Sequence, residues 1–151
     1  MKHLFDATCA DEIKQRILRI DPASEPRWGS MKLAQTLAHC SSGIHMATGE
    51  ISPERAAFPA KLLGLVIKPL VFGNDKPFRR NSPSSPELFT ADPRDFEQER
   101  DQLLATIDNF VSNGPAGCSR EPHPFFGRLT PQQWAILMYK HVDHHLRQFG
   151  A

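Results

Sequence analysis

The residues best suited to chemistry are three histidines near the C-terminus, His141, His144 and His145. Residues four apart on a helix point in the same direction. His141 and His145 can therefore place two imidazole rings on one ion, as the paired histidines of zinc proteases do. Rotation by about 100° per residue turns His144 away from this pair, towards a flank of the helix or solvent. We expect His141 and His145 to be two ligands of a bound divalent metal ion.

Two further side chains are candidates for a catalytic role. Gln148 lies one turn after His145 and beside His141, from where it could orient a ligand or contact a bound water. His123 lies between two prolines in a predicted loop and could act as an acid or base at the mouth of the site. The alternative for His123 is a histidine packed within its loop.

A third metal ligand must come from elsewhere, because catalytic zinc sites usually have three protein ligands and an open position. His39, on another predicted helix, is the best candidate. The apolar face of that helix is defined by Leu33, Leu37 and Ile44, and His39 lies nearly opposite to it. His45 lies nearer the apolar stripe and is the rival. The local pattern therefore leaves the third ligand open.

Four segments show helical periodicity with boundary signals. The predicted helices cover about residues 10–20, 30–48, 92–111 and 130–149. Thr8, Asp92 and Thr130 are the expected N-caps of the first, third and fourth helices, and Asn113-Gly114-Pro115 ends the third. Residues 51–91 form an atypical insertion, with an apolar helix at about 56–71 and an irregular Ser- and Pro-rich loop at 81–86. Residues 114–129 form a second ordered loop, and no segment has the alternation of a strand.

These elements predict an all-α protein, a four-helix bundle with the insertion packed outside it or over one end. The chain has 151 residues, which suits a single domain over 1–151. The apolar segment Leu62–Phe72 is too short and too interrupted to span a bilayer. That segment could mediate a homodimer or pack on its own bundle.

Composition narrows the class of partner and the compartment. The formal net charge of +1 argues against nucleic acid or an anionic membrane as the main partner. The N-terminus lacks the basic and apolar regions of a signal peptide. The 3 cysteines are odd in number and widely spaced, which favours free thiols in a reducing cytoplasm. Cys40, beside His39, could be a soft ligand or a redox thiol, but a small buried core residue fits it better.

A set of motifs along nearly the whole chain resembles a known family. The motifs are Trp28-Gly29-x-Met31, Gln35 with His39, the run Pro122-His123-Pro124-Phe125-Phe126-Gly127, Trp134, and the ending His141-x-x-His144-His145-Leu146-x-Gln148-Phe149. Their order and spacing resemble the DinB/YfiT-like superfamily of four-helix-bundle metalloenzymes, and within it the branch catalogued as DUF1569. The insertion matches least specifically.

The resemblance implies an up-down-down-up bundle and three histidines on a divalent ion, zinc or nickel. Carried onto this chain, these ligands are His39, His141 and His145. Relatives include thiol-S-transferases that use low-molecular-weight thiols such as bacillithiol. The implied activity is therefore a thiol transfer or hydrolysis on a small electrophile, with an ion that lowers the pKa of a bound thiol or water. A non-catalytic metal-binding or stress-response module is the alternative.

Overall fold

The computed structural model describes residues 1–54, 57–81, 88 and 92–151. Five α-helices and no β-strand occur among these residues, so the predicted all-α class is confirmed. The α-helices are α1 (Ala7–Arg19), α2 (Leu33–Thr48), α3 (Phe58–Phe72), α4 (Phe96–Asn113) and α5 (Pro131–Gln148), and a short 3-10 helix, η2 (Gly114–Gly117), follows α4.

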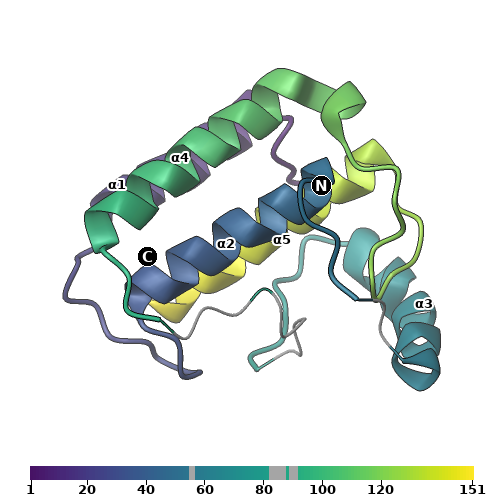
Figure 1. The fold of residues 1–151 in the computed structure, drawn as a ribbon, viewed down its shortest axis with the longest axis horizontal. Helices are drawn as coiled ribbons and strands as arrows, with labels where there is room; N and C mark the ends of the chain where they lie inside the picture. The colour runs from purple at the N-terminus through teal and green to yellow at the C-terminus, as the bar shows by residue number, and fades with distance from the viewer. Residues whose placement is uncertain (55–56, 82–87, 89–91) are drawn as a thin grey trace.

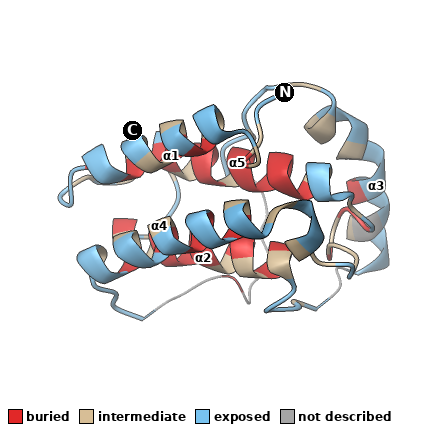
Figure 2. Ribbon diagram, turned by 90° about the horizontal axis from the view of Figure 1, so that it is seen from above, coloured by how far each residue is buried: buried red, intermediate tan, exposed pale blue. Residues whose placement is uncertain are grey.

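Four of the helices pack side by side. α1 lies along α5 and α2 lies along α4, and each pair also contacts the other pair (Figure 2). α3 stands away from these four helices, at one end, and contacts α5 (Figure 1). No helix in the described ranges is long and apolar enough to cross a membrane.

One apolar core joins the four packed helices. Ile13 and Ile17 of α1, Ile44 of α2 and Leu103 of α4 are all fully buried, and Trp134 of α5 is buried beside them. Burial of each aliphatic side chain contributes about 1.5–3 kcal/mol. The core therefore fixes α2 and α5, the two helices that carry most of the histidines, against each other.

The helix starts differ from their predicted positions by a few residues. α1 is capped by Asp6 rather than Thr8, and the Asp6 carboxylate accepts the backbone N–H of Cys9 at 3.0 Å. α4 is capped by Asp95 rather than Asp92, through the backbone N–H of Gln98 at 2.8 Å. A carboxylate that accepts a free N–H of the first turn stabilises a helix start, and Asp6 and Asp95 are the residues that do so here. α2 begins at Leu33 rather than near Ser30.

The boundaries of α5 are confirmed. Thr130 accepts the backbone N–H of Gln133 at 3.2 Å, and the Gln133 side chain accepts the backbone N–H of Thr130 at 3.0 Å. This reciprocal capping box, with Pro131 in the first turn, starts the helix that holds the paired histidines. The third helix was predicted to reach about Val111 and to be ended by Asn113-Gly114-Pro115; α4 extends to Asn113, and Gly114 follows with a φ of +57°.

The insertion is helical where an apolar helix was predicted, as α3, whereas most of the predicted loop at 81–86 lies outside the described residues. Lys140 of α5 is buried, and its ammonium donates to the carbonyls of Val71 at 2.7 Å, Asn74 at 2.5 Å and Lys76 at 3.1 Å. These bonds fix the end of α3 to α5 next to His141. Apolar side chains of α3 nevertheless remain exposed, among them Phe58, Leu62, Val66 and Leu70.

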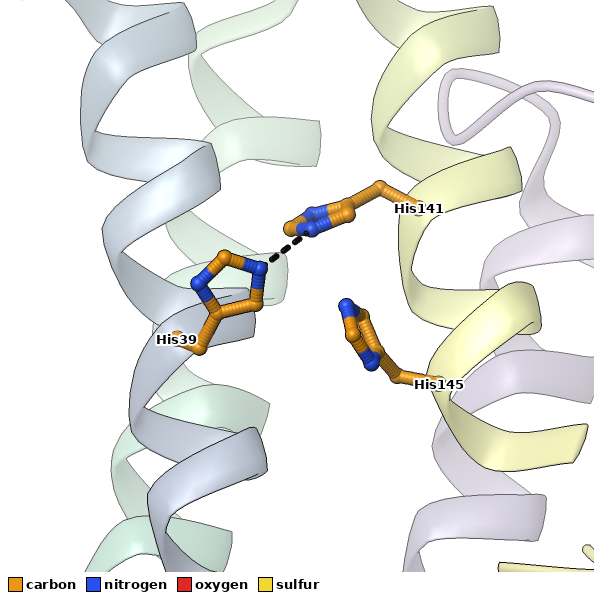
Figure 3. Close-up of side chains that lie close together, drawn as sticks. All are labelled: His39, His141 and His145. Atoms are coloured by element: carbon orange, nitrogen blue, oxygen red, sulfur yellow. Dashed lines mark hydrogen bonds between the residues drawn. The ribbon is translucent and has the colours of Figure 1, made fainter. Parts of the chain in front are cut away.

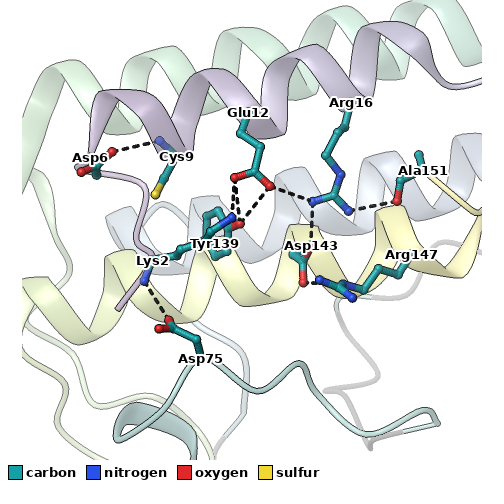
Figure 4. Close-up of polar contacts among 10 residues, drawn as sticks. All are labelled: Lys2, Asp6, Cys9, Glu12, Arg16, Asp75, Tyr139, Asp143, Arg147 and Ala151. Carbon is teal, nitrogen blue, oxygen red and sulfur yellow. Dashed lines mark hydrogen bonds and ion pairs between the residues drawn. The ribbon is translucent and has the colours of Figure 1, made fainter.

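A polar network sets the register of α1 against α5 (Figure 4). Asp143 of α5 is buried and accepts from Arg16 of α1 at 2.7 Å and from Arg147 at 2.8 Å. One turn earlier, Glu12 of α1 accepts from the hydroxyl of Tyr139 at 3.4 Å. Because Asp143 lies between the paired histidines in the chain, this network also holds the helix segment that carries them.

Candidate metal centre

Three histidines from two helices meet in the interior. His39 of α2 and His141 and His145 of α5 bring their ligand nitrogens within 4.8 Å of one another (Figure 3). The ring centroids are 4.8 Å apart for His39 and His141 and 4.9 Å apart for the other two pairs, with rings nearly perpendicular. Three imidazoles from two helices are therefore positioned to hold one metal ion, and they are the three that the family resemblance implied.

His39 lies inside although the apolar stripe of α2 placed it on the opposite side. It is only 1% exposed. α2 packs against both α4 and α5, and its buried residues surround most of the helix. A projection that assumes one buried face cannot place a residue on a helix that is covered on several sides.

Two of the histidines have a fixed tautomer. His39 donates its Nδ1–H to the backbone carbonyl of Leu88 at 2.8 Å, since a carbonyl oxygen can only accept. His145 contacts the Oε1 of Gln148 through Nδ1 at 2.8 Å. The Gln148 Nε2 donates to the carbonyl of Trp28 at 2.5 Å, which fixes the orientation of its amide and makes Oε1 an acceptor. Both rings therefore carry their proton on Nδ1 and leave the Nε2 lone pair for an ion.

His141 approaches the backbone of α2 at Gly43. A Cβ atom at Gly43 would lie 2.8 Å from Nδ1 of His141 and 2.9 Å from its Cε1. The Nε2 of His141 lies 2.9 Å from the Nε2 of His39. Its Nδ1 is buried and has no hydrogen-bond partner in the part of the chain that the structure describes. The ring is thus held mainly by contact with α2 and by the neighbouring imidazole.

Burial keeps all three imidazoles neutral. Burial lowers the pKa of His39, and it lowers the pKa of His141 well below the usual value, with repulsion from His39 and His145 adding to the effect. Burial, followed by repulsion from His39, lowers the pKa of His145 to about 3. Neutral imidazole is the form that binds metal ions, so no proton has to be displaced from a charged ring near neutral pH.

The donor set and its spacing fit a divalent ion. Imidazole nitrogen is a preferred ligand of zinc and nickel. Two nitrogens that bind one tetrahedral zinc ion at about 2.0–2.1 Å lie about 3.3 Å apart. The two Nε2 atoms of His39 and His141 are 2.9 Å apart, so a shift of a few tenths of an ångström would accommodate the ion.

The other helical histidines do not join the cluster. His45 is partly exposed, and its Nδ1 contacts the carboxylate of Glu50 at 2.8 Å. His144 was expected to face a flank or solvent, but it is buried, with its ring centroid 5.7 Å from that of Trp28 and 6.1 Å from that of Phe78. Trp28 and Phe78 cover that side of α5 from segments outside the helices, which explains the difference. His144 also contacts His145, at 5.2 Å between ring centroids.

Gln148 contacts the cluster, whereas the ring of His123 packs against that of Trp134 of α5, at 5.5 Å between centroids. The Nδ1 of His123 accepts the backbone N–H groups of Phe125 at 3.0 Å and Phe126 at 3.2 Å, inside a turn closed by backbone bonds to Gly127. Burial and then the charge of Lys68 lower the pKa of His123 to about 4. Repulsion from His123 makes the smallest of the contributions to the lowered pKa of His141. Gln148 contacts His145 directly.

Cys40 lies outside the ligand group. Its side chain is buried, and burial raises the pKa of its thiol well above the usual range. Among the described residues the only group of three or more potential ligands is His39, His141 and His145. The thiol of Cys40 therefore stays protonated and fits the core role that the sequence favoured.

Three groups at the centre escaped the sequence reasoning. Gly43 had a detectable signal, because a glycine inside a helix is unfavourable and this one is four residues after His39, on the same face. The carbonyls of Leu88 and Trp28 had none, since a backbone acceptor carries no residue-type signature.

The chain belongs to the family DUF1569, described as a protein family of unknown function, whose model matches residues 5–151. No curated protein and no solved structure matches the chain significantly.

Proposed function

We propose that this DUF1569 member is a divalent-metal-dependent enzyme in which His39, His141 and His145 hold a zinc or nickel ion. The observation that carries the proposal is the convergence of three neutral imidazoles, two of which have their tautomer fixed by acceptors behind them. Burial of imidazole costs hydration free energy that an apolar side chain would not lose. A cluster of this kind in a core is therefore better explained by a bound ion than by packing.

We also propose an up-down-down-up bundle of the DinB/YfiT type for α1, α2, α4 and α5. Figure 1 supports it, because α2 and α4 run in one direction and α5 in the other. Glu12 and Arg16 of α1 contact Tyr139 and Asp143 of α5 in the same order, so α1 runs with α5. The long connection between α2 and α4, which holds α3, allows these two neighbouring helices to run parallel.

The reaction that we propose is transfer of a low-molecular-weight thiol to a small electrophile, or hydrolysis of such an electrophile. When bound, the ion would supply a Lewis acid that lowers the pKa of a thiol or water. In the transfer, a carbon–sulfur bond forms, the leaving group departs with its bonding electron pair, and the thiol proton passes to solvent or a nearby base. The protein keeps the three ligands neutral and excludes bulk water from His39.

Gln148 and His123 have different proposed roles. Gln148 is a positioning residue, because it fixes the tautomer and orientation of His145. The Nδ1 of His123 already accepts two backbone N–H groups, so any exchange of a proton or hydrogen bond with a substrate would use its Nε2. With a pKa of about 4, His123 is neutral near pH 7 and acts there as a hydrogen-bond donor.

Metal content tests the first part of the proposal. We expect about one ion per chain in protein purified without a histidine tag, measured by elemental analysis. His145→Ala should lose the ion, whereas His45→Ala, a change of the same type on α2 outside the cluster, should retain it. The proposal would be refuted if wild-type protein without metal had the same fold, stability and activity as wild-type protein with metal.

Activity is tested on the metal-loaded protein with a small thiol and an activated aryl halide, by following the release of halide. We expect turnover that is lost on chelation and in His145→Ala and that persists in His45→Ala. Absence of turnover with intact metal binding across several thiols and electrophiles would favour the non-catalytic alternative.

One observation favours a structural ion as the second candidate function. The three ligands come from α2 and α5, so an ion would cross-link two core helices. This candidate predicts a large loss of melting temperature on chelation and a coordination sphere filled by protein atoms. A substrate-accessible coordination position would contradict it.

The expected homodimer stays a prediction. Exposed apolar side chains on α3 are consistent with an oligomer contact but do not identify the partner. Sedimentation velocity at two protein concentrations tests it, and a monomer at both would contradict it.

A further inference from the structure

A cleft of about 310 Å³ lies beside the metal centre and is separate from it. His144 forms part of its wall, and the ring of His144 contacts that of His145. The volume lies at the lower end of the range for small-molecule sites. None of the residues that line the cleft is a ligand of the proposed metal ion.

Two of the three arginines in the cleft are held in place by the chain. The backbone N–H of Arg27 donates to the carbonyl of Gln148 at 2.8 Å, and its guanidinium crosses the α-carbon of Gly150 so closely that a Cβ there would collide with it. Gly150 has a φ of +83°, which also favours glycine. The guanidinium of Arg80 lies 4.5 Å from the ring centroid of Trp28, in a cation–π contact. These contacts lower the entropy lost when a ligand binds the two arginines.

The third arginine, Arg147, reaches the cleft from α5. Its Nε donates to Asp143 at 2.8 Å, and Asp143 also accepts from Arg16. The oxygen of Ala151, which lines the cleft, accepts from Arg16 at 3.0 Å. Within the described ranges, no carboxylate forms an ion pair with either of the other two cleft arginines. The cleft therefore carries uncompensated positive charge, although the whole chain has a formal net charge of only +1.

The remaining wall of the cleft is aromatic and apolar. Pro77, Phe78 and Trp28 line it together with His144. The His144 ring lies between Trp28, at 5.7 Å, and Phe78, at 6.1 Å between centroids. An apolar wall beside fixed guanidinium groups selects for a ligand with both an anionic group and an apolar body.

We propose that this cleft binds a small organic anion, a carboxylate or phosphate ester, with its anionic group on Arg27, Arg80 and Arg147 and its apolar body against Phe78. Guanidinium groups bind pairs of carboxylate or phosphate oxygens through paired hydrogen bonds, which explains the use of arginine here. The cleft shares Trp28 with the support of His145, because the Trp28 carbonyl accepts from Gln148. An anion in it is therefore held beside the metal centre.

Calorimetric titration with phenyl phosphate and benzoate tests the proposal on the full chain in the presence of a chelator. We expect both probes to bind, more weakly as salt increases. Benzyl alcohol, which has the body without the charge, and inorganic phosphate, which has the charge without the body, should each bind at least about tenfold more weakly than phenyl phosphate.

Substitutions locate the binding. Arg27→Gln with Arg80→Gln should weaken phenyl phosphate binding at least about tenfold. Arg19→Gln with Arg120→Gln removes the same charge from exposed arginines outside the cleft and should leave binding unchanged. Because loss of Arg27 could disturb the contact with Gly150, Arg80→Gln alone is the second variant, and it should weaken binding severalfold with an unchanged melting temperature.

Three results would overturn the proposal. The first is absence of heat with phenyl phosphate at millimolar concentration, and the second is equal weakening in the cleft and control variants. The third is binding that appears only with added metal and disappears in His145→Ala, since the anion would then bind the ion. Anion binding that persists in metal-free His145→Ala supports the cleft even if the proposed metal function fails.

Discussion

Gly43→Ala distinguishes the effect of residue 43 on the stability of α2 from its effect on metal binding by His141. In the interior of a helix, glycine to alanine normally stabilises a protein by about 0.5–1 kcal/mol. Here the new Cβ would lie 2.8 Å from Nδ1 of His141, and ordinary contact begins at 3.4 Å. The ring must therefore withdraw by about 0.6 Å, whereas metal–ligand distances tolerate only about 0.2 Å. We expect metal affinity to fall about 10- to 100-fold, as for loss of a group that orients a ligand.

The consequence for stability follows from linkage. If the wild type is measured at an ion concentration of about 1,000 times its Kd, the ion stabilises it by about 4.1 kcal/mol. A 100-fold weaker site at the same concentration retains only about 1.4 kcal/mol. The metal-free variant should stay within about 1 kcal/mol of wild type, because the gain in helix propensity offsets the contact.

The assay is urea unfolding of both proteins with chelator and with added zinc, together with competition against a chromophoric chelator. Ser42→Ala, a change to alanine one position earlier on α2, is the matched control and should keep the wild-type affinity. If Gly43→Ala binds metal with wild-type affinity, the prediction is refuted, because either His141 is not a ligand or its ring does not depend on the absence of a side chain at Gly43. A large destabilisation of the metal-free variant would show that the ring cannot withdraw.

Three further predictions concern the surroundings of the site. Gln148→Ala should weaken metal binding about 10- to 100-fold in chelator competition, and Gln148→Glu, which keeps an acceptor for His145, should recover part of it; equal losses would contradict a positioning role. Lys140→Met should lower the free energy of unfolding in urea by about 2–3 kcal/mol, because it removes charged hydrogen bonds to three carbonyls, and an unchanged value would exclude their contribution. The free energy of unfolding of the metal-free protein should fall as the pH drops below 6.5. The reason is that His141 and His145 bind protons in the unfolded chain but not in the folded protein, where their pKa values are lowered. The expected loss is up to about 1.4 kcal/mol per pH unit for each histidine. In His145→Ala that slope should be smaller, and stability that is flat between pH 6.5 and 4 would contradict the neutral cluster.

The parts of the structure that could be predicted are those with local causes. Thr130, Pro131 and Gln133 define the start of α5 by short-range capping, and the spacing of His141 and His145 follows from one helix. These features need no knowledge of neighbouring elements. Capping signals also predicted the starts of α1 and α4 to within a few residues. The errors arose because each start has two candidate N-caps, Asp6 and Thr8 for α1 and Asp95 and Asp92 for α4.

The parts that could not be predicted depend on several segments at once. His39 faces the site because α4 and α5 cover α2 on different sides, which a single helical stripe does not reveal. His144 is buried because Trp28 and Phe78 come from irregular segments without periodicity. The family resemblance predicted His39 as the third metal ligand from the order of the motifs, but it gave no prediction for the burial of His144.

Gly43 is a sequence feature of α2 that is related to the metal centre, although α2 provides only one of the three ligands. Glycine inside a helix costs stability, and a close approach of another side chain to the helix backbone can compensate for that cost. In α2 that approach is the ring of His141, which reaches the helix backbone one turn from His39. His141 and His145 on α5 therefore have a counterpart on α2, where His39 and Gly43 have the same spacing. His39 is positioned to bind the ion, and Gly43 leaves space for the ring of His141. The same spacing occurs at His45 and Gly49, and the end of α2 at Thr48 distinguishes the two pairs, because it makes Gly49 a C-cap and leaves Gly43 inside the helix.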